Sequence, residues 1–117
     1  MGIRLKRIYD PAEADDGYRV LVDRLWPRGV AKGDARLDAW HRALAPSKAL
    51  REWFGHDRER WPDFRSAYAR ELADADPDLL AELREHAGHE GLTLLYAARD
   101  TECNNAVVLK QVLEQTP

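Results

Sequence analysis

The chain has 117 residues, of which 44% are hydrophobic and 33% are charged, and its formal net charge is −3. This length and composition predict one globular domain over residues 1–117 and exclude a collagen-like, disordered or disulfide-rich chain. The mildly acidic balance disfavours a protein that coats nucleic acid in bulk, because such a protein needs a strongly basic surface.

Neither a membrane span nor a signal peptide is expected. The longest apolar runs, residues 19–26 and 92–98, are far shorter than the roughly 20 residues that cross a bilayer. The single cysteine, Cys103, cannot form an internal disulfide, which suits a reducing compartment. We therefore predict a cytoplasmic protein without a membrane partner.

The first part of the chain predicts two strands. Residues 3–9 alternate apolar and basic side chains, which is typical of a half-buried strand. Residues 18–26 contain the unbroken apolar run Val20-Leu21-Val22, which is typical of a strand buried on both faces. Only about ten residues join the two strands, too few for a parallel crossover, so the strands would be antiparallel if they were neighbours.

Residues 34–90 predict three helices. Ser47 and Asp57 can each cap the start of one, and Asp76 can cap the third because Pro77 follows it at the first helical position. Apolar side chains recur at helical spacing in the second and third of these helices, which predicts that both apolar stripes pack in the core.

The last part of the chain predicts a second buried strand, residues 92–98, and a helix that is capped by Asp100 or Thr101 and runs to about Gln115. The long interval before this strand leaves room for a helical crossover, so the two buried strands are expected to be parallel. The pattern predicts a small three-layer α/β fold, in which a mixed sheet has a parallel central strand pair and helices pack on it. Ligands bind such sheets outside the carboxyl ends of the strands.

The first candidate site follows the first buried strand, in residues 23–29 (DRLWPRG). The guanidinium groups of Arg24 and Arg28 offer planar donor forks that match phosphate or carboxylate. Gly29 would let a ligand approach its backbone N–H closely. The structural alternative is that Asp23 pairs with Arg24 and that Pro-Arg-Gly is only a turn.

The second candidate site follows the second buried strand, in residues 97–105 (AARDTECNN). Arg99 would complete a three-arginine pocket, and the free N–H groups of the following helix would attract an anion. Asp100 suits a helix cap better than a catalytic acid, and the two asparagines can bond either a ligand or the backbone. The predicted ligand-binding residues are Arg24, Arg28, Gly29, Arg99, Asp100, Asn104 and Asn105.

Asp23 and His56 are the candidate acid/base groups. His56 stands beside Asp57, and a histidine paired with a carboxylate can move a proton near neutral pH, although Asp57 is also wanted as a cap. Cys103 falls in the expected first turn of the last helix, where the helix dipole lowers a thiol pKa. No base stands beside it in the sequence, so we expect Cys103 to be dispensable.

No metal site is predicted, because His86 and His89 share a helix face but lack a third ligand at a recognisable spacing. The lack of a third metal ligand also disfavours a metal-dependent hydrolase. A further alternative is a non-catalytic protein-interaction or regulatory module, with Trp26, Trp40 and Trp53 on its surface. Burial of the tryptophans distinguishes that alternative from ligand binding.

Several stretches of the chain match a known bacterial pattern. They are YDPAEADDGYRVLVDRLWPRG, LAPSKALREWFGHD, the spacing F-x3-Y-x2-EL from Phe64 to Leu72, and LTLLYAARDTECNNAVVL. Over nearly the whole chain the sequence resembles the YeaO-like family, a bacterial domain-of-unknown-function family. The resemblance implies no catalytic residues, since the family has no established activity. Members often carry histidine or another polar residue where this chain has Cys103, and only this cysteine matches the Cys-His-Arg string of larger relatives, which argues against shared thiol chemistry.

The sequence thus favours a small cytosolic protein that binds an anionic metabolite, nucleotide or nucleic-acid end through Arg24, Arg28 and Arg99. It leaves open whether the protein is an enzyme, and it identifies neither a cofactor nor a reaction.

Overall fold

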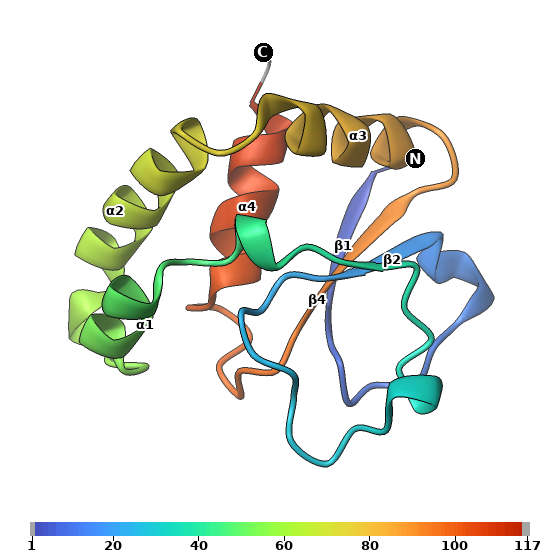
Figure 1. Cartoon of the computed structure of the whole chain (residues 1–117), viewed down its shortest axis with the longest axis horizontal. Coiled ribbons are helices and arrows are strands. Elements are labelled where there is room, and N and C mark those ends of the chain that lie inside the picture. The colour runs from blue at the N-terminus through green and yellow to red at the C-terminus, as the bar shows by residue number, and fades with distance from the viewer. Residues whose placement is uncertain (1, 116–117) are drawn as a thin grey trace.

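A parallel sheet forms the centre of the computed structural model, which describes residues 2–115 (Figure 1). Its strands are β1 (Ile3–Arg7), β2 (Tyr18–Leu21), β3 (Ala39–Trp40) and β4 (Leu92–Tyr96). Their order across the sheet is β1-β4-β2-β3, so the last strand of the chain lies between the first two.

β2 and β4 form the predicted central pair. They run parallel, with Val20 opposite Leu94 and Leu21 opposite Leu95. All four side chains are fully buried, because both faces of these strands are covered. The predicted parallel pairing of the two apolar runs is confirmed, and so is the α/β class.

The predicted mixed sheet is wrong, because every strand pair of the sheet is parallel. The link between β1 and β2 is short, as expected, but it does not join neighbours: each of these strands pairs with β4. β1 has 5 residues and is therefore about 17 Å long, a length that roughly ten extended residues can easily span on the way back. Residues 8–17 thus return the chain to the start of β2 without an α-helix, and the short 3-10 helix Ala14–Asp16 lies within them.

The helices are α1 (Lys48–Phe54), α2 (Trp61–Ala73), α3 (Pro77–Gly88) and α4 (Asn105–Glu114). The three predicted helix starts are confirmed: Ser47 caps α1, Asp76 caps α3, and Asp57 caps the 3-10 helix Arg58–Arg60 that leads into α2. Each of these side chains accepts a backbone N–H of the first turn. Within residues 2–115, no helix is long and apolar enough to cross a membrane.

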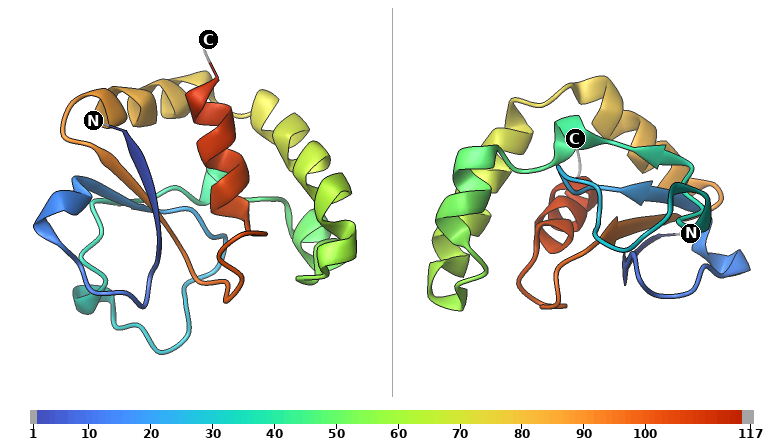
Figure 2. Two further views of the ribbon diagram at one scale, coloured as in Figure 1. Left: turned by 180° about the vertical axis from the view of Figure 1, so that it is seen from behind. Right: turned by 60° about the horizontal axis from the view of Figure 1, so that its bottom comes forward.

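The helices gather on one face of the sheet (Figure 2). Val20 and Leu94 belong to a core cluster with apolar residues of all four helices, including Phe64 of α2 and Leu109 of α4. This burial accounts for the predicted apolar stripes.

Loop segments cover the opposite face. Leu21 and Leu95 pack there with Ala35, Trp26 and Trp40, of which Ala35 and Trp26 belong to the irregular stretch 23–38. The predicted third layer therefore consists of loop, with no α-helix in it, and the connection from β2 to β3 supplies it.

α4 begins later than predicted. Its cap is Asn104, whose side chain accepts the N–H of Val107 at 3.1 Å. Asp100 instead accepts the N–H groups of Glu102 and Cys103, which closes a separate turn before the helix. Asp100 is thus not the helix cap, and Cys103 precedes the helix instead of lying in its first turn.

Candidate functional site

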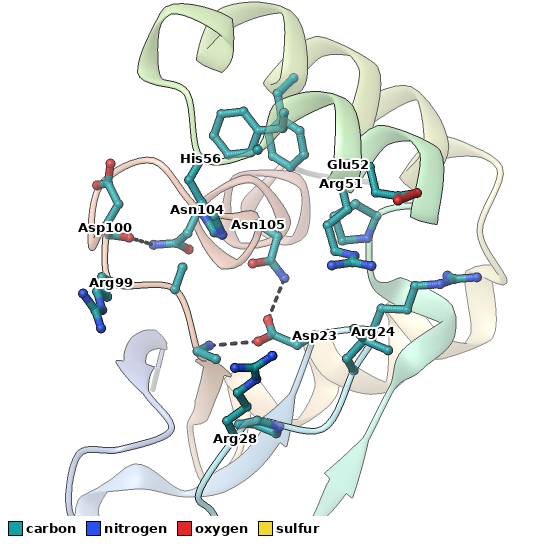
Figure 3. Close-up of a pocket in the computed structure, with 18 of the residues that line it drawn as sticks. Asp23, Arg24, Arg28, Arg51, Glu52, His56, Arg99, Asp100, Asn104 and Asn105 are labelled. Carbon is teal, nitrogen blue, oxygen red and sulfur yellow. Dashed lines mark hydrogen bonds between the residues drawn. The ribbon is translucent and has the colours of Figure 1, made fainter.

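A pocket of about 810 Å³ lies at the carboxyl ends of β2 and β4 (Figure 3). It is enclosed by the segments that follow these two strands, by α1 with the turn after it, and by the start of α4. Its charged and polar lining residues are Asp23, Arg24, Arg28, Arg51, Glu52, His56, Arg99, Asp100, Asn104 and Asn105. This is the sheet edge at which a ligand site was predicted.

The three predicted arginines line this one pocket, but they are spread around it. Arg28 extends toward Asp23 in the middle of the pocket, whereas Arg24 and Arg99 lie at opposite sides of it (Figure 3). A ligand that contacts all three must therefore reach across the opening.

Sequence reasoning missed Arg51, which comes from α1 and also lines the pocket (Figure 3). Arg51 and Gly55 are four residues apart and share a helix face, so the packing that brings the end of α1 to the pocket also brings Arg51. The four-residue spacing could have indicated that Arg51 lines the pocket. It could do so only if the position at which α1 packs were already known.

The pocket arginines share an unpaired state. Within residues 2–115, no hydrogen bond or ion pair engages the guanidinium groups of Arg24, Arg28, Arg51 and Arg99. Some guanidinium groups elsewhere donate to carbonyl or carboxylate oxygens, as those of Arg7, Arg19, Arg58 and Arg84 do, whereas exposed arginines such as Arg65 and Arg70 have no such partner within residues 2–115. What distinguishes the pocket arginines is that four unpaired guanidinium groups line one pocket. The donors of the pocket arginines are therefore available to a ligand.

Asp23 ties the walls of the pocket together. Its Oδ2 accepts the N–H of Ala97 at 2.9 Å, and its Oδ1 accepts from Asn105 Nδ2 at 3.2 Å. Burial raises the pKa of Asp23 above its usual 3.8, although the hydrogen bonds from Ala97 and Asn105 act in the opposite direction. The structural alternative, a local pair of Asp23 with Arg24, is not formed within the described chain.

Asn105→Ala is expected to raise the pKa of Asp23 further, because the amide donor that stabilises the charged carboxylate is lost. A carbon-13 NMR titration of the Asp23 carboxyl should give a midpoint above 3.8 in the wild type and a higher one in the variant. Over that window the folded state binds more protons than the unfolded state, so Asp23 lowers stability as pH rises. Gln111→Ala, an exposed change on α4, is the control, and an unchanged or lower midpoint in Asn105→Ala would contradict the assignment.

Asn104 and Asp100 line the pocket, but their polar atoms are engaged within the fold. Asn104 is 2% exposed, caps α4 and donates to the carbonyl of Asp100 at 2.9 Å. Both carboxylate oxygens of Asp100 accept from Arg58 at 2.8 Å, and this pairing together with two backbone N–H groups lowers the pKa of Asp100 to about 2. These contacts favour structural roles for both residues.

His56 lines the pocket from a strained backbone position. Its φ is +60°, directly after Gly55 at φ +51°, and side chains other than glycine rarely adopt this left-handed region. The imidazole extends toward Asn104 (Figure 3). A strained residue that lines a pocket is typical of a side chain used in function.

Gly29 does not line this pocket. It borders a neighbouring one of about 430 Å³, together with residues such as Val30 and Arg36. Its φ of +76° explains the glycine, and a Cβ added there would meet no atom within 4 Å. The backbone turn therefore explains the glycine at position 29. A ligand in the arginine pocket does not need a glycine there.

The three-tryptophan surface is not formed. The rings of Trp26 and Trp40 pack edge to face at 5.3 Å, and each indole N–H donates to a backbone carbonyl at 2.7 Å. Both residues are half-buried in the loop-covered face of the sheet, whereas Trp53 on α1 is 42% exposed. This burial weakens the interpretation of the protein as an interaction module built on these residues.

Comparison with known proteins identifies a family. Residues 2–116 match the one described as the inactive DUF488-N3 subclade. The chain belongs to this subclade. It is 47% identical over 109 residues to "Uncharacterized protein YeaO" of Escherichia coli (strain K12), which covers 93% of this chain and 94% of the relative. It is 45% identical over 111 residues to "Uncharacterized protein Rv3073c" of Mycobacterium tuberculosis (strain ATCC 25618 / H37Rv), which covers 95% and 92%.

These identities confirm the resemblance to the YeaO-like family. No solved structure matches the chain.

In this member of the DUF488-N3 subclade, burial and the charge of Asp100 raise the pKa of the Cys103 thiol, contrary to the lowering expected from a helix dipole. Within residues 2–115, no group of three or more His, Cys, Asp or Glu side chains is arranged to hold a metal ion.

Proposed function

We propose that this protein is a cytoplasmic, single-domain binding protein that holds a phosphate- or carboxylate-bearing small molecule in the arginine pocket without transforming it. The observation that carries the proposal is the set of pocket arginines, whose guanidinium groups have no protein partner within residues 2–115. Each guanidinium presents a fork of donors that matches an oxyanion.

The charge balance of the pocket supports an anionic ligand. Asp100 is paired with Arg58, so Asp23 and Glu52 are the remaining acidic side chains among the lining residues. The four arginines outnumber them, although the whole chain carries a formal net charge of −3. A cleft whose charge is opposite to that of the molecule concentrates anions locally.

The family description supports binding without catalysis, because the subclade is described as inactive. The raised pKa of Cys103 also disfavours a thiolate nucleophile. An enzyme that uses Asp23 and His56 as acid and base is the second candidate, and it is favoured by the burial of Asp23 and the strained backbone of His56 in the same pocket. Product formed from a bound ligand would distinguish this enzyme from a binding protein.

A thermal-shift screen at constant ionic strength tests the proposal. Phosphate, citrate, sugar phosphates and nucleotides are added to the full chain, and a ligand that binds the folded state raises the unfolding temperature by an amount that grows with the logarithm of its concentration above the dissociation constant. We expect at least one of these anions to stabilise the wild type and to lose this effect in Arg28→Ala/Arg51→Ala. Stabilisation by none of them, or equal stabilisation of the double variant, would contradict the proposal.

His56→Gly should move binding and stability in opposite directions. Glycine relieves the strain at φ +60°, so the free energy of unfolding should rise by about 1 kcal/mol, while affinity for the best anion of the screen should fall. Urea unfolding and calorimetry measure the two effects. Gly55→Ala, at φ +51°, is the opposite control and should lower stability. A His56→Gly variant that binds normally would show that the imidazole does not contact the ligand.

A further inference from the structure

The pocket is much larger than the group that arginines recognise. Its volume of about 810 Å³ lies within the range of roughly 300–1,000 Å³ that is common for sites of drug-sized ligands. A phosphate or carboxylate group is only a few times larger than a water molecule, which occupies about 30 Å³ in the liquid. An anion bound by the arginines is therefore one end of a larger molecule.

Another part of the pocket lining is apolar and rigid. Pro27, Pro46, Phe54 and Phe64 contribute to it. The two phenylalanine rings stack on each other at 4.2 Å with an interplanar angle of 18°, and both are fixed in the core. Because Phe54 and Phe64 are only 5% and 2% exposed, they contribute small apolar patches at the bottom of the pocket. Leu25, at 56%, and Tyr9, at 46%, supply its exposed apolar lining. An exposed aromatic and aliphatic lining suits a planar ring better than a flexible polar chain.

Tyr9 connects the aromatic and the charged parts of the pocket. It lines the pocket, is 46% exposed and donates its hydroxyl to the carbonyl of Arg28 at 3.0 Å. The guanidinium of Arg7 lies over its ring at 4.8 Å. An aromatic side chain is thus held beside Arg28 by contacts on both its hydroxyl and its ring.

Hydrogen-bond acceptors occupy the middle of the pocket. Asn105 uses Nδ2 to donate to Asp23 and to the carbonyl of Val22, so its Oδ1 is left without a donor within residues 2–115. The Asp23 carboxylate beside it accepts one N–H on each oxygen and has lone pairs to spare. Hydroxyl or amino groups of a ligand would match these acceptors.

From these three parts we infer that the ligand is a nucleoside monophosphate. The phosphate binds Arg28 with one of the neighbouring arginines, the sugar hydroxyls donate to Asp23 and Asn105, and the planar base lies against the apolar lining that Tyr9 and Leu25 expose. This inference rests on the proposed function and narrows its ligand to one chemical class.

Calorimetric titration of the full chain tests the inference with matched fragments. The probes are AMP, GMP, CMP and UMP, the corresponding nucleosides without phosphate, and ribose 5-phosphate without a base. At least one monophosphate should bind about tenfold or more tightly than both its nucleoside and ribose 5-phosphate, since each end contributes separately. Arg28→Ala should weaken the monophosphate and ribose 5-phosphate by a similar factor and leave any nucleoside binding unchanged.

The contrary outcomes separate the inference from the function on which it rests. Ribose 5-phosphate that binds as tightly as every monophosphate would overturn the nucleotide assignment and leave the anion site intact, as would binding of citrate or sugar phosphates alone. A nucleoside that binds as tightly as its monophosphate would remove the role of the arginines. Absence of binding by every anion tested would overturn both proposals.

Discussion

Arg28→Ala will weaken binding of an anionic ligand by roughly tenfold to a hundredfold and will leave folding intact. Arg28 extends toward the middle of the pocket, and its guanidinium has no partner within residues 2–115 (Figure 3). Truncation therefore removes a charge-assisted contact of about 1.5 to 3 kcal/mol from the complex and breaks none in the free protein.

Calorimetry with the best anion of the screen measures the affinity, and urea unfolding measures the stability. Arg65→Ala is the matched control, because Arg65 is an exposed arginine of α2 outside the pocket. A variant of Arg28 that binds normally, or one that loses stability instead of affinity, would show that this arginine serves the fold.

The second large effect concerns the fold itself. Asp16→Asn should lower the free energy of unfolding by about 3–5 kcal/mol, because it leaves buried or partly buried cations without their counter-charge. The Asp16 side chain is fully buried and bonds Lys6 Nζ at 3.0 Å, the guanidinium of Arg19 and the N–H of Glu13. Arg19 is itself 6% exposed. The network joins Lys6 of β1 to Arg19 near the start of β2.

The Asp16→Asn substitution should also change how stability depends on pH. Burial opposes ionisation of Asp16, but the hydrogen bonds from Glu13, Lys6 and Arg19 outweigh it and hold the pKa of Asp16 below its usual 3.8. The stabilisation is therefore present above pH 3.8 and is lost as pH falls through the lower folded pKa.

Asp16→Asn should lack this acid-dependent loss in urea unfolding measured across the acid range. Asp15→Asn is the control, since the Asp15 side chain is 82% exposed. If both variants lost equally little stability, the network would not hold the strands together.

Features encoded by neighbouring residues were predictable. The apolar runs of β2 and β4 each report burial on both faces, and Ser47, Asp57 and Asp76 each mark a helix start through a local hydrogen bond. The strand order was not predictable in this way, because β4 enters between β1 and β2 through contacts with residues far away in the chain. The start of α4 was ambiguous because Asp100 and Asn104 can both cap, and only the tertiary fold decides between them.

The residues of the candidate site also differ in whether the sequence alone could predict them. Asp23 follows from its place just after β2, and Asn105 from its place in the segment that leads from β4 into α4, since parallel strands deliver the segments after them to one edge. Arg51 depends on where α1 packs, and the pairing of Asp100 with Arg58 joins residues that are 42 positions apart. Gly29 was predicted to line the arginine pocket because it directly follows Arg28. It borders the neighbouring pocket instead.

Binding of an anion by the unpaired arginines of the pocket can be observed in NMR spectra of the arginine Nε–Hε groups. The nitrogen-15-labelled protein is titrated with inorganic phosphate at constant ionic strength. We expect saturable shifts of the Arg28 and Arg51 signals that share one dissociation constant, while the signals of the exposed Arg65 and Arg70 of α2 stay unchanged. Shifts that do not saturate, or that are equally large at Arg65 and Arg70, would contradict it.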